Sequence, residues 1–191
     1  MKIKMMRNMD RNEAIELIKK HVKNDKLYKH MLAVEAIMKG MANFLNEDID
    51  SWGLTGLLHD IDFDETIDNF KNHGILAENI LKGKVNENII RAIKAHNFEY
   101  TNVNPESKLE KALIAADAIS GLIIACALIM PSKKLNEVRV ETIKKKFKSK
   151  DFAKGSSRER ILLCESIGIP KEKFFEIALN SLKNISNELN L

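Results

Sequence analysis

Four of the five histidines in the chain form a pattern with two aspartates. In chain order, the members of this pattern are His30, His59, Asp60, His73, His96 and Asp117. Each lies in or beside a strongly apolar segment, where an unpaired carboxylate or imidazolium is costly to bury. Such groups on inward faces of different helices need either one another or a metal ion. Imidazole nitrogens combined with carboxylate oxygens suit iron, manganese, zinc or nickel, and magnesium less well.

Helical spacing indicates that the first of these histidines faces the interior. Val34, Ile37 and Met41 follow His30 at steps of four, three and four residues, which places them all on one helix face. A carboxylate can bridge two ions, and Asp60, which directly follows a histidine, is the natural candidate for that role.

Each residue of the pattern also has a simpler explanation. A single histidine on an apolar helix face is more often a core residue than a ligand. Asp117 would equally cap a helix or pair with Arg91 or Lys94. The His-Asp doublet alone occurs by chance in many proteins. Only the combination of all these residues favours a metal site.

A phosphorylated substrate would need positive groups near such a site. The clearest basic stretch leads up to Arg160 and contains the candidate phosphate ligands Lys154, Ser156 and Arg158. A serine at a helix start, with arginines beside it, would form an anion-binding terminus. A solvated helix face with an ordinary serine cap (Ser156 or Ser157) explains the stretch equally well.

Further candidates lie closer to the pattern itself. Arg91 and Lys94 precede its fourth histidine by about one turn or less and would reach a phosphate there. Asp60 and Asp62 are the candidate catalytic residues, Asp62 as a base or as an acceptor behind a ligand. Asp64, slightly further on, fits a solvated acidic loop better.

Taken as a set, the residues resemble the HD-domain superfamily of metal-dependent phosphohydrolases. The signature of that superfamily is a histidine, a His-Asp doublet and a later aspartate on a helical bundle. His30 matches the first histidine, and Asp117 in AADAISGL matches the last aspartate. His59 and Asp60 in GLLHDID match the doublet.

His73 in KNHG and His96 in KAHN match the members of the superfamily that have a two-metal centre. The resemblance therefore implies two divalent transition-metal ions that share Asp60, with iron or manganese ahead of nickel, zinc or magnesium. It also implies a metal-activated water that attacks phosphorus, with the ions about 3.5–4 Å apart. The chain has no Gly-Tyr-Pro motif, and Asp62 stands where many relatives have glycine, so cyclic-dinucleotide cleavage is not implied.

The function implied by the resemblance is cleavage of a phosphoester or phosphoanhydride in a nucleotide or other small phosphorylated metabolite. Two alternatives remain open. One is a di-iron oxygenase of the inositol-oxygenase-like type, and the other is a catalytically silent metal-binding regulatory module. The basic residues favour the phosphohydrolase.

Composition agrees with a folded enzyme of ordinary size. The chain has 191 residues, 45% hydrophobic and 30% charged, and a net charge of +4, which is too small to indicate nucleic-acid binding. Only 6% of the residues are aromatic, which argues against a base-stacking surface. Cys126 and Cys164 lie in apolar segments without metal-binding spacing, and no signal peptide is evident, so we expect a cytoplasmic protein. A homo-oligomer is compatible with the sequence.

Apolar periodicity predicts an all-α, single-domain helical bundle of the HD-domain type. The predicted helices cover about 10–23, 26–45, 50–60, 72–81, 86–95, 108–130, 136–147, 157–167 and 170–187. The predicted organisation is an N-terminal extension (1–9) and one hydrolase domain (10–191), divided into a metal-binding core (26–130) and C-terminal helices (131–191). The segment 112–130 is apolar enough to span a membrane, but its single charge, Asp117, favours a buried core helix.

Overall fold

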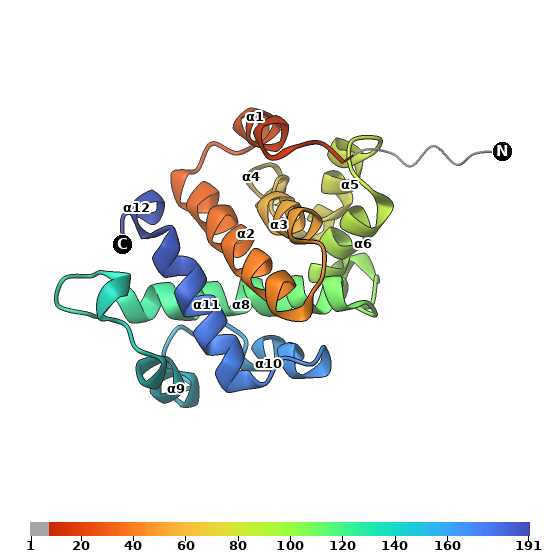
Figure 1. The fold of residues 1–191 in the computed structure, drawn as a ribbon. Helices are drawn as coiled ribbons and strands as arrows, with labels where there is room; N and C mark the ends of the chain where they lie inside the picture. Colours follow the sequence, from red (N-terminus) through yellow and green to blue (C-terminus); the bar gives the residue numbers. More distant parts are fainter. Residues whose placement is uncertain (1–7) are drawn as a thin grey trace.

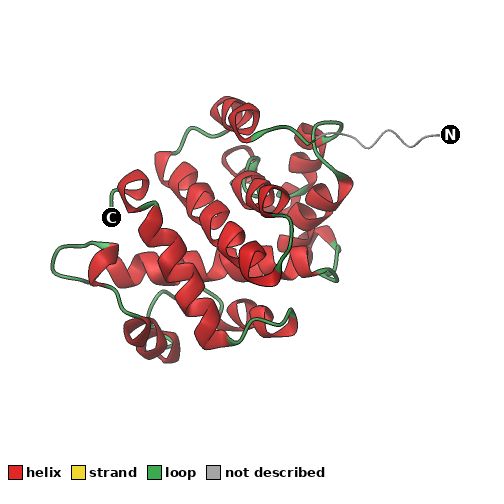
Figure 2. Ribbon diagram, in the orientation of Figure 1, coloured by secondary structure: helices red, strands yellow, loops and turns green. Residues whose placement is uncertain are grey.

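The computed structural model describes residues 8–191, and these form helices joined by short loops, without a strand (Figures 1 and 2). The N-terminal half contains α1 (Arg11–His21), α2 (Asp25–Leu45), α3 (Ile49–Leu58), α4 (Phe63–Thr66), η1 (Phe70–Asn72), α5 (Ile75–Leu81), α6 (Glu87–His96) and α7 (Phe98–Thr101). The C-terminal half contains α8 (Lys108–Leu128), η2 (Leu135–Glu137), α9 (Val140–Lys148), α10 (Arg158–Ser166), α11 (Lys171–Asn184) and α12 (Ser186–Leu189). The prediction of an all-α bundle is confirmed.

Side-chain caps explain where the main helices begin. Asp10 and Glu13 form a capping box at the start of α1, and Ser107 and Glu110 form another at the start of α8. The predicted N-terminal extension lies mostly outside the described residues. Of its described part, the Met9 N–H donates to the Lys84 carbonyl at 2.9 Å, which ties the chain to the end of α5.

Helix α8 is the central element of the fold. Figure 1 shows it passing behind α2 and α11, and it also packs against α6 and α10. Among the described residues it is the one helix long and apolar enough to cross a membrane, with a mean hydropathy of 1.9, and 67% of that window is buried inside the fold. This burial is what a core helix requires, as the lone aspartate in the sequence indicated.

Helices α2 and α3 approach each other unusually closely at Gly56. A Cβ atom at this position would lie 2.9 Å from backbone atoms of Val34 and Glu35. Glycine therefore permits the contact, which places the end of α3 against the middle of α2. This contact positions His30 on α2 next to His59, which directly follows α3.

The fold differs from the predicted helices at the start of α5. We expected a helix from residue 72, but His73 is extended (ψ 127°) and Gly74 has a φ of +87°, so α5 begins at Ile75. Glycine tolerates that conformation without a Cβ clash. This break in the helix turns the His73 side chain toward the interior. Its contacts there stabilise the extended conformation more than helix formation at this residue would.

Candidate metal centre

All six residues of the sequence pattern come together around the Asp60 carboxylate. Its Oδ2 lies 3.3 Å from Nε2 of His59 and 3.6 Å from Nε2 of His30. Its Oδ1 lies 3.3 Å from Nε2 of His73 and 3.5 Å from Nε2 of His96. Each oxygen thus faces a different pair of histidines, which is the arrangement expected of a bridging carboxylate.

The two histidine pairs are themselves tightly spaced. Nε2 of His30 lies 3.2 Å from Nε2 of His59, and Nε2 of His73 lies 2.9 Å from Nε2 of His96. Asp117 on α8 joins the first pair, with Oδ1 3.2 Å from Nε2 of His30. The candidate ligands thus form two groups that share one carboxylate.

The outward nitrogens of the histidines are all bound to acceptors. Nδ1 of His59 lies 2.8 Å from the Gly56 carbonyl, and Nδ1 of His96 contacts the Ile93 carbonyl. Since carbonyls only accept, both Nδ1 atoms carry the proton. Each Nε2 therefore presents a lone pair to the centre of the site.

The other two histidines are held in the same way. Nδ1 of His73 lies 2.9 Å from an Asp62 carboxylate oxygen. Nδ1 of His30 lies 3.3 Å from the Ser120 hydroxyl, which donates its own proton to the Asp117 carbonyl at 2.8 Å. The hydroxyl must therefore accept from Nδ1 of His30.

These tautomers make the site fit a metal ion. When both rings of a pair are neutral, the two lone pairs that face each other at 3.2 Å or 2.9 Å cannot share a hydrogen bond. An added proton, which the raised pKa of His73 permits without metal, or a cation between the rings satisfies both nitrogens. The carboxylates are suited to the same role. Burial opposes ionisation of Asp60, but His59, His73 and His96 hold the pKa of this carboxyl well below its usual range. A deprotonated carboxylate is the form that binds metal.

Of the two roles predicted for Asp62, its position agrees with an acceptor behind a ligand and not with a catalytic base. Its side chain is fully buried, and it accepts hydrogen bonds from the N–H groups of Gly74 at 2.8 Å and Ala77 at 2.9 Å, besides His73. It does not line the cavity over the site. Asp62 therefore orients His73 and closes the start of α5, and its position does not support a role as the base.

A cavity of about 610 Å³ opens over the ligands. Its lining comprises Leu27, His30, Asp60, Phe63, Phe70, His73, His96, Asn97, Glu99, Tyr100, Asp117 and Arg160. Phe70 and Tyr100 contact each other edge to face, with ring centroids 5.5 Å apart, and remain partly exposed. The lining thus combines an aromatic wall of Phe70 and Tyr100 with the charged ligand cluster, which Phe70 adjoins through its contact with His73.

Two predicted phosphate ligands lie away from this cavity. Arg91 forms ion pairs with Glu110 at 2.7 Å and Glu106 at 3.2 Å, and Lys94 forms one with Glu78 at 2.6 Å. Neither residue lines the cavity. Acidic side chains that lie close in the fold have neutralised both cations, so the prediction that they bind phosphate is not supported.

The basic side chains before α10 also have contacts different from the predicted phosphate binding. The Arg158 guanidinium donates to six backbone carbonyls of the loop around it: Lys146, Phe147, Ser149, Phe152, Ala153 and Ser156. It therefore stabilises the loop, whose carbonyls need donors. Lys154 is exposed and pairs with Asp151 at 3.3 Å. Of the predicted phosphate ligands, Ser156 alone lines a pocket beside the metal centre.

Arg160 is the cationic side chain that does line the cavity. It donates to the His96 carbonyl at 3.2 Å, and its Nη2 lies 2.5 and 2.6 Å from the two carboxylate oxygens of Glu99. The sequence pattern did not mark it as a site residue separate from its neighbours. Its position three residues after Ser157, in the first turn of α10, was the one available signal.

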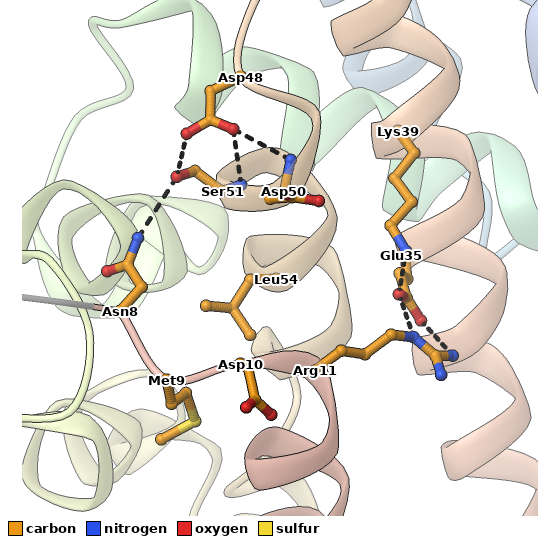
Figure 3. A pocket seen from close by; sticks show the side chains of 10 residues that line it. All are labelled: Asn8, Met9, Asp10, Arg11, Glu35, Lys39, Asp48, Asp50, Ser51 and Leu54. Atoms are coloured by element: carbon orange, nitrogen blue, oxygen red, sulfur yellow. Dashed lines mark hydrogen bonds and ion pairs between the residues drawn. The ribbon is translucent and has the colours of Figure 1, made fainter.

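A second cavity, of about 480 Å³, lies between α1, α2 and α3 (Figure 3). Its central charges bind one another: Arg11 and Lys39 each lie 2.6 Å from Oε1 of the buried Glu35 (Figure 3). The pair of Arg11 with Glu35 joins α1 to α2, and the pair of Lys39 with Glu35 lies within α2. The chemistry of the ligand cluster is absent here, so the metal centre is the stronger candidate for the functional site.

Comparison with known proteins agrees with the geometry. The family model described as "HD domain" matches residues 27–122, about half of the chain, and this stretch contains all six candidate ligands. No curated protein and no solved structure matches the chain. One conclusion follows from the order of the candidate ligands along the sequence, their convergence on Asp60 and the extent of this match. The chain belongs to the HD domain family.

Proposed function

We propose that the protein is a metal-dependent phosphohydrolase that acts on a nucleotide or another small phosphorylated metabolite in the cytoplasm. Membership of the HD domain family supports hydrolase chemistry. The observation that carries the proposal is the Asp60 carboxylate, whose two oxygens face two separate histidine pairs.

The ligand groups favour two ions, iron or manganese in the first place, with nickel, zinc or magnesium as alternatives. His30, His59, Asp60 and Asp117 would hold the first ion, and Asp60, His73 and His96 the second. Bound ions would supply an activated water and positive charge against the phosphoryl group.

The other residues of the cavity determine how a substrate lies. The Arg160 guanidinium is paired with Glu99, but unlike Arg91 and Lys94 it lines the cavity, where its remaining N–H groups would donate to an anionic group. The exposed faces of Phe70 and Tyr100 offer a surface for the organic part of the substrate. Aromatic side chains together with Arg160 and metal ions bound at the ligand cluster would fit a phosphorylated organic molecule of modest size.

The test combines metal analysis with a substrate screen. Freshly purified protein should contain about two transition-metal ions per chain and release inorganic phosphate from one or more members of a panel of nucleotides and sugar phosphates. The Asp60→Asn variant should lose most of the metal and all activity. Asp68→Asn, at an exposed position near the site, serves as the matched control and should behave like the wild type.

Two other outcomes would contradict the proposal. Substrate-dependent oxygen consumption by the iron-loaded protein, without phosphate release, would identify an oxygenase. Full metal occupancy with no turnover of the panel and no oxygen uptake would identify a regulatory module.

A further inference from the structure

A smaller pocket of about 380 Å³ lies beside the first ligand group, at the start of α10. Its lining comprises His30, Asp117, Ala118, Gly121, Gly155, Ser156, Ser157 and Arg160. Three of these residues, His30, Asp117 and Arg160, also line the large cavity. The two pockets therefore meet at the metal centre, and a substrate can occupy both.

The first turn of α10 offers free hydrogen-bond donors to this pocket. Ser157 caps the helix by accepting from the Arg160 N–H at 3.3 Å. Within the described part of the chain, the N–H groups of Ser157, Arg158 and Glu159 have no acceptor. Unpaired N–H groups and the positive end of the helix dipole together favour an anion.

Ser156 gives a second, independent indication of a ligand. It is only 8% exposed, yet its hydroxyl has no hydrogen-bond partner in residues 8–191. Among the described residues every fully buried side-chain polar atom has a partner, so the hydroxyl is the part of Ser156 that remains accessible, and it faces the pocket. The hydroxyl points toward Gly121, since a Cβ atom on that glycine would lie 2.9 Å from Oγ of Ser156. A polar group is thus held in a pocket that provides no protein partner for it.

The residues around the pocket fix the position of the Ser156 hydroxyl and of the N–H groups at the start of α10, and they leave space for a ligand beside them. Arg158 binds the carbonyls of the loop that carries Ser156, including that of Ser156 itself at 2.6 Å. Gly121 and Gly155 contribute no side chains to the pocket, and no atom would lie within 4 Å of a Cβ on Gly155. Arg160 supplies a positive charge at the boundary with the large cavity.

We infer that this pocket is the phosphate subsite of the substrate. The inference rests on the proposed function and narrows the substrate class. The substrate is an organic phosphate whose phosphate group reaches the Ser156 hydroxyl and the N-terminus of α10, while its organic part lies along the aromatic wall of the large cavity. A tetrahedral oxyanion is the appropriate ligand because hydroxyl, N–H and guanidinium donors surround the space, and Asp117 is committed to His30.

The experiment measures binding of inorganic phosphate to the full-length chain, both metal-loaded and after treatment with a chelator. Isothermal titration gives the affinity, and backbone amide resonances of the chelator-treated protein show which N–H groups respond. We expect the amides of Ser157, Arg158 and Glu159 to shift on titration. Ser156→Ala should weaken phosphate binding about tenfold through loss of one hydrogen bond to a charged ligand.

Gly121→Ala provides a second variant that fills the pocket instead of removing a donor. Gly121 is an exposed position inside α8, where alanine favours the helix, so the fold should be retained while phosphate binding is lost. Ser166→Ala, at the other end of α10, is the matched control and should bind phosphate like the wild type.

The outcomes separate this inference from the proposed function. If both variants bind phosphate as the wild type does, or if the three amides do not shift, the subsite is wrong even when the protein hydrolyses phosphoesters. If phosphate binding depends on Ser156 but the protein lacks metal and activity, the subsite stands and the proposed function fails.

Discussion

Asp62 accepts the Nδ1 proton of His73 at 2.9 Å, and through this bond a fully buried carboxylate fixes the ring of a candidate metal ligand. The same carboxylate accepts from two N–H groups at the start of α5. Burial opposes protonation of His73, but its hydrogen bonds to Asp60 and Asp62 raise the pKa of this histidine to about 9 in the metal-free protein. The Asp62–His73 hydrogen bond therefore links the second ligand group to the start of α5.

Replacement of Asp62 should affect the second ion selectively. In Asp62→Ala, the His73 ring loses its orienting acceptor, and affinity for the second ion should fall about 10–100-fold. Elemental analysis at limiting metal should then give about one ion per chain. Asp62→Asn retains one acceptor oxygen and should preserve more of the second site. Unchanged occupancy of two ions in Asp62→Ala would show that the carboxylate has no orienting role.

The two histidine pairs predict different losses for different substitutions. His73→Ala should remove one ion and leave the group around His30 and His59 intact, since the Asp60 carboxylate still completes it. Asp60→Ala should remove both ions. The half-buried His21 lies outside the cluster and is paired with Glu65, so His21→Ala is the control. Equal metal content in His73→Ala and the wild type would eliminate the second site.

Metal binding should stabilise the fold because the ligands come from several helices. Each ion at about 100 times its dissociation constant would add about 2.7 kcal/mol. For a chain of this size, that corresponds to a rise in Tm of roughly 5–10 °C per ion. Scanning calorimetry with and without a chelator measures the difference, and the Asp60→Ala variant should show none. A wild-type Tm that is insensitive to the chelator would place the metal outside the core.

Residue type and order along the chain were sufficient to predict which histidines and aspartates come together in the candidate metal centre. Histidine and aspartate in apolar helices are costly to bury, so their presence already indicates a function. The helices followed from apolar periodicity, and α2, predicted over 26–45, spans Asp25–Leu45.

The polar residues around the ligands could not be predicted in the same way, because their roles depend on distant partners. Arg160 pairs with Glu99, which is 61 residues away in the sequence. The position of Arg91 in the sequence makes it a reasonable phosphate ligand, but in the fold it forms an ion pair with Glu110 at 2.7 Å. Whether a cation is free to bind substrate is therefore decided by tertiary contacts. The extended conformation of His73 likewise depends on Asp62, which no local pattern reveals.

At acidic pH, the free energy of unfolding should depend on the ionisation of Glu110, at the start of the core helix α8. Burial opposes its ionisation, but the N–H groups of Glu106 and Ser107, together with Arg91, lower the pKa of this carboxyl. A lowered folded-state pKa means that the carboxylate stabilises the protein above its unfolded pKa, near 4.5, and that this contribution is lost as the pH falls through the folded value.

Urea denaturation should therefore show Glu110→Gln to be less stable than the wild type at pH 7, with a smaller difference at pH 4. Glu106→Gln, at an exposed position, should have little effect at either pH. A difference for Glu110→Gln that stays constant between the two pH values would mean that packing, and not charge, accounts for its contribution.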